Sequence, residues 1–223
     1  MSNKIYLSPA LHGIDNPTKC PMDCSENTHC GQYMDIVEKR LKDHGFSVKR
    51  GNGDTGEQAM FDRVKESNEW GAELHYAAHT NGGGGRYSMT MCYDGTNSKR
   101  AAEFVGKNRK NLPPDSWHKV VVTNDLYELA YTNCAAVYDE LVFHDNAEDC
   151  AWFHKNMELM AEDTVKAFCE YFGVEYKEKA KEEKSNVIFR VQVGAFIEKK
   201  NAISFMEQLK RDGYDPFLVE VKQ

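Results

Sequence analysis

The sequence lacks a long apolar run, although 41% of its 223 residues are hydrophobic. No stretch approaches the roughly 18 consecutive apolar residues that a membrane-spanning helix needs, so we expect no membrane insertion. An excess of basic residues is also missing, since 28 Lys and Arg face 35 Asp and Glu and give a net charge of −7. A nucleic-acid-binding protein needs a basic stripe to neutralise phosphates, so we expect no nucleic-acid partner.

A secretory signal is missing from the first residues as well. The segment MSNKIYLSPALHG offers one Lys and an apolar run of three residues, far short of a signal-peptide core. We therefore expect the protein to be made in the cytoplasm and to need a separate route of release if it acts outside the cell. The seven cysteines are odd in number, and we expect no disulfide framework.

Strand-like and helix-like patterns alternate from Lys4 to Gly173, which is typical of an α/β fold. The predicted strands are residues 4–8, 46–50, 73–79, 87–93, 120–123 and 135–143. The predicted helices are residues 26–44, 57–70, 98–110, 125–132 and 146–172, with Gly45, Gly71 and Gly173 at three helix ends. A loop rich in Pro, Cys, Asn and Gly precedes the first helix.

The C-terminal part begins a second pattern. Residues 175–184 contain four Glu and four Lys and read as a charged linker. Residues 187–196, 199–213 and 216–222 then predict a strand, a helix and a strand. We therefore expect a catalytic domain over 1–174, a linker over 175–184 and a small βαβ unit over 185–223.

Four side chains stand at positions where α/β sheets bind ligands, at or near the carboxyl ends of strands. They are His12, Glu26 at the head of the first helix, His79 and Glu140. Two histidines and one carboxylate leave the fourth position of a tetrahedral zinc ion to water, as in catalytic sites. A second carboxylate is the base that such a water needs.

Other interpretations of these residues stay open from spacing alone. His75 lies four residues before His79 on one face of the same predicted strand and is a rival ligand or a core histidine. Glu26 is also typical of a first-turn acid that the helix dipole favours. Glu140 could be one more charge at a strand end.

The cysteines of the long loop offer a competing metal site. Cys20, Cys24 and Cys30 with His29 could supply four soft ligands for a structural zinc. Their spacings, with three and five intervening residues, fit zinc-finger patterns poorly. We therefore expect these cysteines to bind no second metal.

Local segments of the chain resemble zinc-dependent N-acetylmuramoyl-L-alanine amidases of the amidase-3 type. SPALHG carries His12, a Glu follows fourteen residues later at position 26, and HTN ends a strand at His79. The segment AAVYDELVFHDNAED aligns Glu140 with the family's catalytic glutamate, with Phe, Asn and an acidic pair in register after it. The form ELVFHDN is most similar to phage endolysins.

This resemblance implies a mixed twisted sheet flanked by helices and a peptidoglycan substrate. It implies Zn²⁺ held by His12, Glu26 and His79, with Glu140 as the catalytic base. The bond cut would be the amide between N-acetylmuramic acid and L-alanine. Asn81 and His144 are then candidates for substrate or second-shell contacts. A zinc peptidase cutting within the stem peptide, or a non-catalytic wall-binding protein with a structural zinc, is the alternative.

The C-terminal segment RVQVGAFIEKKNAISFMEQLKRDGYDPFLVEV resembles the first half of a SPOR domain, a cell-wall-binding module. A full module has two strand-helix-strand repeats, whereas this chain has one. A unit of about 39 residues is too small to bury a core of its own. In the SPOR-like fold, the two strands of one repeat are not neighbours, because a strand from the other repeat lies between them. We therefore expect a homodimer in which two copies complete each other's sheet.

Overall fold

The computed structural model describes residues 3–10, 20–51, 56–178 and 191–221. The chain divides into two compact units, Met1–Glu178 and Lys179–Gln223. Within the described residues, no helix is both long and apolar enough to cross a bilayer.

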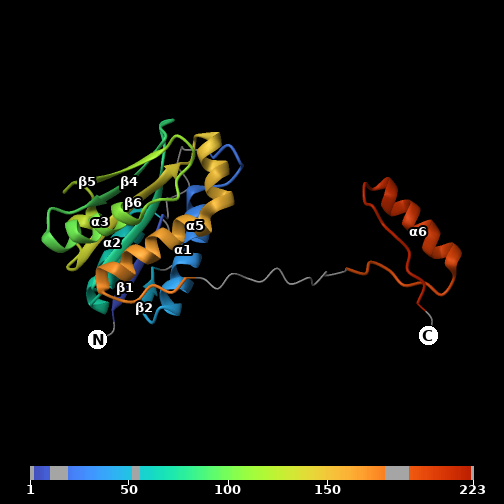
Figure 1. Ribbon diagram of the computed structural model, residues 1–223, viewed down its shortest axis with the longest axis horizontal. Helices are drawn as coiled ribbons and strands as arrows, with labels where there is room; N and C mark the ends of the chain where they lie inside the picture. Colours follow the sequence, from blue (N-terminus) through green and yellow to red (C-terminus); the bar gives the residue numbers. More distant parts are fainter. Residues whose placement is uncertain (1–2, 11–19, 52–55, 179–190, 222–223) are drawn as a thin grey trace. The chain divides into compact units, whose positions relative to one another are not determined.

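The N-terminal unit is built on one six-stranded sheet (Figure 1). Its strands follow in the order β2-β1-β3-β6-β4-β5, and β4 runs antiparallel to β6 while the other pairs are parallel. The bounds are Lys4–Pro9 for β1, Ser47–Arg50 for β2, Leu74–Asn81 for β3, Tyr87–Cys92 for β4, Trp117–Val122 for β5 and Ala135–Phe143 for β6. The predicted α/β class and mixed sheet are confirmed.

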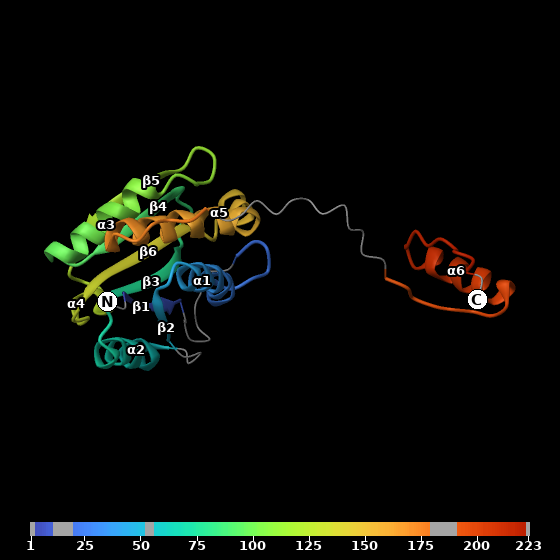
Figure 2. The same ribbon diagram turned by 60° about the horizontal axis from the view of Figure 1, so that its bottom comes forward.

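In the described residues of this unit, five helices flank the sheet. They are α1 (Glu26–Asp43), α2 (Glu57–Trp70), α3 (Thr96–Asn108), α4 (Tyr127–Ala130) and α5 (Ala147–Phe172). Helices α1, α3 and α5 contact the sheet and α5 contacts both of the others, whereas α2 packs with α4. Figure 2 shows α2 on the side of the sheet away from α3 and α5.

The helix ends follow from local sequence. Ser25 caps α1, because its side chain accepts a hydrogen bond from the Thr28 amide. Asn146 caps α5 in the same way and accepts from the amides of Glu148 and Asp149. Gly173 ends α5 in the left-handed region at φ 69°, as its sequence position predicts.

The main core lies between the sheet and the layer of α1, α3 and α5. Alternate residues of β1 and β3, such as Ile5, Leu7, Leu74 and Tyr76, pack there against α1 and α5. A buried ion pair between Arg109 and Asp139 also lies within this unit. This layer brings the first residue of α1 close to the carboxyl end of β3, where the candidate site lies.

The pairing of β3 with β6 changes register near that end. His79 pairs with Glu140, but Asn81 pairs with Phe143 and not with Val142. One extra residue of β6 therefore lies opposite this stretch of β3.

The C-terminal unit contains one helix in its described part, α6 (Lys199–Arg211). Residues 191–196 and 214–221 form no strand, so the strands predicted there are wrong for the single chain as far as the described residues go. A strand needs a neighbour for its backbone hydrogen bonds, and this half unit supplies none for either segment.

Candidate active site

His79 and Glu26 meet at the carboxyl end of β3. Glu26 is buried at the first position of α1, and its Oε1 atom lies 3.0 Å from Nδ1 of His79. The same oxygen accepts a hydrogen bond of 3.0 Å from the Thr80 amide. Two residues 53 positions apart in the chain are thus fixed side by side. The interpretation of Glu26 as only a first-turn acid does not account for this contact.

Glu140 stands next to His79 on the adjacent strand β6. Its Oε2 atom is buried and has no hydrogen-bond partner among the described residues. Burial, together with the nearby carboxylates of Glu26 and Asp139, raises the pKa of Glu140 to about 8. A carboxyl group with one buried oxygen that lacks a hydrogen-bond partner among the described residues, beside a histidine and a second carboxylate, is suited to taking up and releasing a proton.

Tyr138 orients the His79 ring. The two rings stack with centroids 4.4 Å apart and planes 14° apart. Because β3 and β6 are parallel and in register here, Tyr138, Glu140 and His79 lie on the same face of the sheet. Nothing in the sequence pattern pointed to Tyr138, since its contact with His79 depends on the pairing of these strands.

His12 lies outside the described residues. The described chain leads to Ala10, whose amide donates to the Ala78 carbonyl at 2.9 Å, one residue before His79. The assignment of His12 as a ligand stays a prediction.

His75, the rival ligand, belongs to a different group of side chains. It is fully buried, its Nε2 atom lies 3.1 Å from Oε1 of Glu128, and its ring stacks on Tyr6. Glu128 also accepts a hydrogen bond from Ser8. His75 is thus a core histidine with a carboxylate partner in α4.

Asn81 is the last residue of β3, and His144 directly follows the adjacent strand β6. The Asn81 side chain accepts from the Gly82 amide at 2.8 Å. The His144 amide donates to the Asn81 carbonyl, and its Nδ1 atom lies 2.8 Å from Oγ1 of Thr80. Their contacts hold the loop after β3 together, and a role toward substrate stays a prediction.

Asp145 fixes the glycine-rich loop and was missed by sequence reasoning. Its carboxylate accepts from the amides of Gly83 and Gly84, which have φ of 110° and 70°. A Cβ atom at Gly85 would overlap the Phe143 ring, so this position also requires glycine. The loop NGGGG is therefore shaped by its contacts with the segment after β6.

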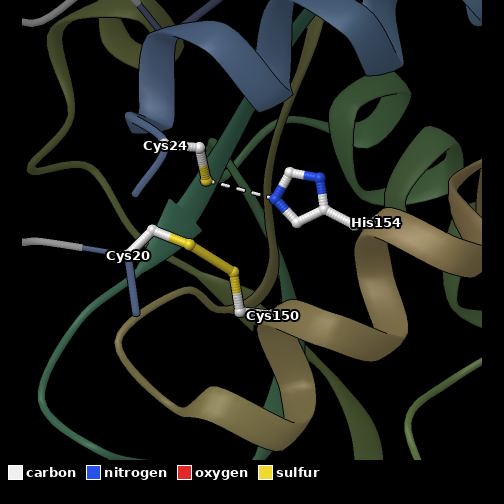
Figure 3. A group of neighbouring side chains, drawn as sticks. All are labelled: Cys20, Cys24, Cys150 and His154. Carbon is white, nitrogen blue, oxygen red and sulfur yellow. Dashed lines mark hydrogen bonds between the residues drawn. A yellow bond between two sulfur atoms is a disulfide. The ribbon is translucent and has the colours of Figure 1, made fainter. Parts of the chain in front are cut away.

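The cysteines depart from the sequence prediction. Cys20 and Cys150 are joined as a disulfide, and Cys24 and His154 lie beside them (Figure 3). Cys30 is buried elsewhere, where burial and the charges of Glu26 and Glu140 raise its pKa well above the ordinary value. The sequence analysis expected no disulfide framework, and the described residues contain one disulfide, which folding makes between residues 130 positions apart.

The donor set fits a zinc ion. An imidazole nitrogen and a carboxylate oxygen bound at about 2.0–2.2 Å would be spaced by roughly 3.3–3.5 Å on one tetrahedral ion. Nδ1 of His79 and Oε1 of Glu26 are 3.0 Å apart, so a small outward movement of one side chain would admit the ion. The buried oxygen of Glu140 beside them lacks a partner among the described residues, as expected for a group that serves a bound water.

Comparisons with known proteins found similar chains for both parts of the protein. Residues 170–220 match the SPOR domain family. Over 97% of its length the chain is 22% identical to the sporulation-specific N-acetylmuramoyl-L-alanine amidase of Bacillus subtilis (strain 168), of which 84% is covered.

Solved structures of similar fold extend this finding. The catalytic domain of an N-acetylmuramoyl-L-alanine amidase from Bacillus (Paenibacillus) polymyxa var. colistinus matches with a TM-score of 0.68 and 19% identity, covering 78% of this chain and 100% of that one. The apo form of such an amidase from Mycobacterium abscessus matches with a TM-score of 0.66 and 17% identity, over 77% and 100%. The predicted resemblance to these amidases, with a SPOR segment, is confirmed, and the N-terminal unit has their fold.

Proposed function

We propose that the N-terminal unit is a zinc-dependent N-acetylmuramoyl-L-alanine amidase. Its substrate would be bacterial peptidoglycan, and the bond cut would be the amide between N-acetylmuramic acid and the L-alanine of the stem peptide. One observation carries this proposal. Glu26, His79 and Glu140 lie together near the carboxyl ends of the central strands β3 and β6, in a unit with the amidase fold.

Three residues would hold the metal in this proposal: His12, Glu26 and His79. Zinc, when bound, supplies a Lewis acid for the amide carbonyl and makes hydroxide available near neutral pH. The amide of Thr80 keeps the Glu26 carboxylate in place. Tyr138 keeps the His79 ring in the plane that brings Nδ1 toward Glu26.

Glu140 would carry the proton. Its carboxylate accepts a proton from the attacking water and passes it to the nitrogen of the leaving L-alanine. The buried position of Oε2 excludes competing solvent from one side of this transfer. A base of this kind contributes about 10²- to 10⁴-fold in rate.

Mass spectrometry of digested cell walls tests the proposal. An amidase releases peptides that begin with a free L-alanine amine. Glu140→Gln should keep the fold and lose the release of these peptides, whereas the matched change Glu148→Gln, at an exposed residue of α5, should keep it. New termini inside the stem peptide would instead indicate a zinc peptidase, and the absence of any product would indicate a wall-binding protein.

For the C-terminal unit we propose cell-wall binding together with homodimer formation. The SPOR match supports the first role. Exposed apolar side chains support the second, because in a single chain they are uncovered: Val191, Val193, Ile197, Val219 and Val221. Light scattering should give a dimer for the whole chain and a monomer for a chain cut near Lys184. A monomer in both cases would contradict the dimer.

The setting of the activity is also a proposal. The segment ELVFHDN is similar to phage endolysins, which supports synthesis in the cytoplasm followed by release to the wall at lysis. Expression of this protein in a bacterial host, with and without a co-expressed pore-forming protein, tests this. We expect the host to lyse from within only when the pore-forming protein is also present.

A further inference from the structure

A second cluster of metal-ligating side chains lies between the loop before α1 and the start of α5. It consists of Cys20, Cys24, Cys150 and His154, whose ligand atoms all lie within 4.8 Å of one another. Figure 3 shows the sulfur atoms and the His154 ring turned toward one another. We propose that these four side chains bind a structural zinc ion when the cysteines are reduced, at a site separate from Glu26 and His79.

The ligand chemistry fits a closed zinc site. Three thiolates and one imidazole form a set that structural zinc sites use, with no position left for water. Cys20 and Cys24 are separated by three residues, within the spacing of two to four that such cysteine pairs show, and the poorly fitting gap of five residues before Cys30 is not part of this site. Cys150 and His154 are four positions apart in α5, which places them on one face of the helix.

The distances also fit. Zn–S bonds of about 2.3 Å and Zn–N bonds of about 2.0 Å place tetrahedral ligand atoms roughly 3.5–3.8 Å apart. The Sγ atom of Cys24 is 3.1 Å from Nε2 of His154, so a small outward movement of one side chain would admit the ion between them. The Cα atoms of Cys20 and Cys150 are 7.0 Å apart, beyond the usual disulfide range of about 4.4–6.8 Å.

A disulfide alone does not use the whole cluster. It joins Cys20 to Cys150 and leaves the Cys24 thiol and the His154 ring directed at the same point. Zinc would engage all four groups at once. The two states exclude each other, because the same two sulfur atoms cannot be both oxidised and thiolate ligands.

His29 supports the cluster from the side of the active site. Its Nδ1 atom lies 3.4 Å from the sulfur of Cys24, and its Nε2 atom lies 2.7 Å from Oγ1 of Thr80. With its proton on Nδ1, the ring donates to the Cys24 sulfur and accepts from the Thr80 hydroxyl, as residues beside metal ligands commonly do.

This arrangement couples the cluster to the proposed catalytic site. Cys24 lies two residues before Glu26, and Thr80 donates its amide to Glu26. A zinc ion that ties Cys20 and Cys24 to α5 would therefore fix the start of α1, and with it the position of the Glu26 carboxylate.

Zinc analysis of the full chain tests the inference. The protein is purified with a phosphine reductant and without chelators, in a His79→Ala background that removes the proposed catalytic ion. We expect one zinc per chain. Adding Cys24→Ser should abolish this zinc, whereas the matched change Cys134→Ser, at a cysteine outside the cluster, should leave it bound.

Cobalt substitution gives a readout that does not depend on the folding of a cysteine variant. In the His79→Ala chain, bound Co²⁺ should give a sulfur-to-metal charge-transfer band in the near ultraviolet and the visible bands of tetrahedral geometry. The absence of that band would overturn the site, as would zinc that persists after Cys24→Ser. A Cys20–Cys150 disulfide that survives the reductant would also overturn it. Cell-wall digestion by the parent chain tests the proposed function separately, so the two failures are distinguishable.

Discussion

The two units of this chain cover their apolar side chains in different ways. In the N-terminal unit, Ile5, Leu7 and Leu141 are fully buried by a sheet whose strands find their neighbours within the chain. In the described part of the C-terminal unit, α6 forms but Val191, Ile197 and Val221 are exposed. A helix makes its hydrogen bonds within itself, whereas a strand depends on a partner. The predicted helix of the half unit therefore forms, and its predicted strands do not form within residues 191–221.

The largest expected effect comes from the buried ion pair. Arg109→Met leaves the fully buried Asp139 without its cation and should destabilise the protein by about 3–5 kcal/mol. The matched change in the other unit, Lys200→Met, removes an exposed pair with Glu198 and should leave the unfolding midpoint unchanged. Chemical denaturation followed by tryptophan fluorescence measures both. Equal effects would show that the two units unfold together.

Truncating an apolar side chain should give the next largest difference in stability between the two units. Leu141→Ala opens a cavity in β6 and should cost about 2–5 kcal/mol. Ile197→Ala removes a fully exposed side chain and should change the stability of the N-terminal unit by less than about 0.5 kcal/mol. If Ile197→Ala instead converts a dimer to a monomer in light scattering, it locates the surface that covers this residue.

Helix caps provide a smaller contrast. Asn146→Ala removes the hydrogen bonds to the first amides of α5 and should cost about 1 kcal/mol. Glu198 precedes α6 but makes no side-chain cap bond, so Glu198→Ala should have no comparable effect on helix content. Thermal unfolding followed by circular dichroism compares the two.

The smallest effect is the pH dependence of two carboxylates. Burial opposes ionisation of Glu162, but hydrogen bonds from Arg40 and Tyr176 outweigh it and lower its pKa below the ordinary value. A lowered folded pKa contributes stability that is present above the unfolded value of about 4.3 and is lost as the pH falls through the folded value. In the Glu162→Gln variant, the free energy of unfolding should therefore fall less steeply as the pH is lowered than in the parent protein. Lys199 also lowers the pKa of Glu220, but this pair is exposed. Glu220→Gln should therefore leave the loss of stability at low pH unchanged.

The elements that the sequence predicted well are those with strong local signals. The caps at Asn146 and Gly173 bound α5, and the alternation before the glycine-rich loop located β3. The start of β5 at Trp117 was missed, since its first residues carry no apolar alternation and take their place from pairing with β4.

For the candidate site, the family-like segments predicted Glu26, His79 and Glu140, which the fold brings together. The partners of Cys20 and Cys24 were not predicted, because they come from α5 and not from the nearby Cys30 and His29. The signal that was available is the four-residue spacing of Cys150 and His154 on a predicted helix.

The register shift between β3 and β6 bears on how this protein can vary in length. Residues of β6 up to Glu140 take their position from His79, whereas those from Phe143 onward take theirs from Asn81. Deleting Leu141 or Val142 would remove the extra residue and leave Phe143 opposite Asn81 in a regular ladder, so the loop that Asp145 holds and the cap at Asn146 would keep their places. A further residue inserted here would instead push the start of α5 outward by about 3.3 Å, the rise of one strand residue. This short stretch should therefore accept a deletion more readily than an insertion.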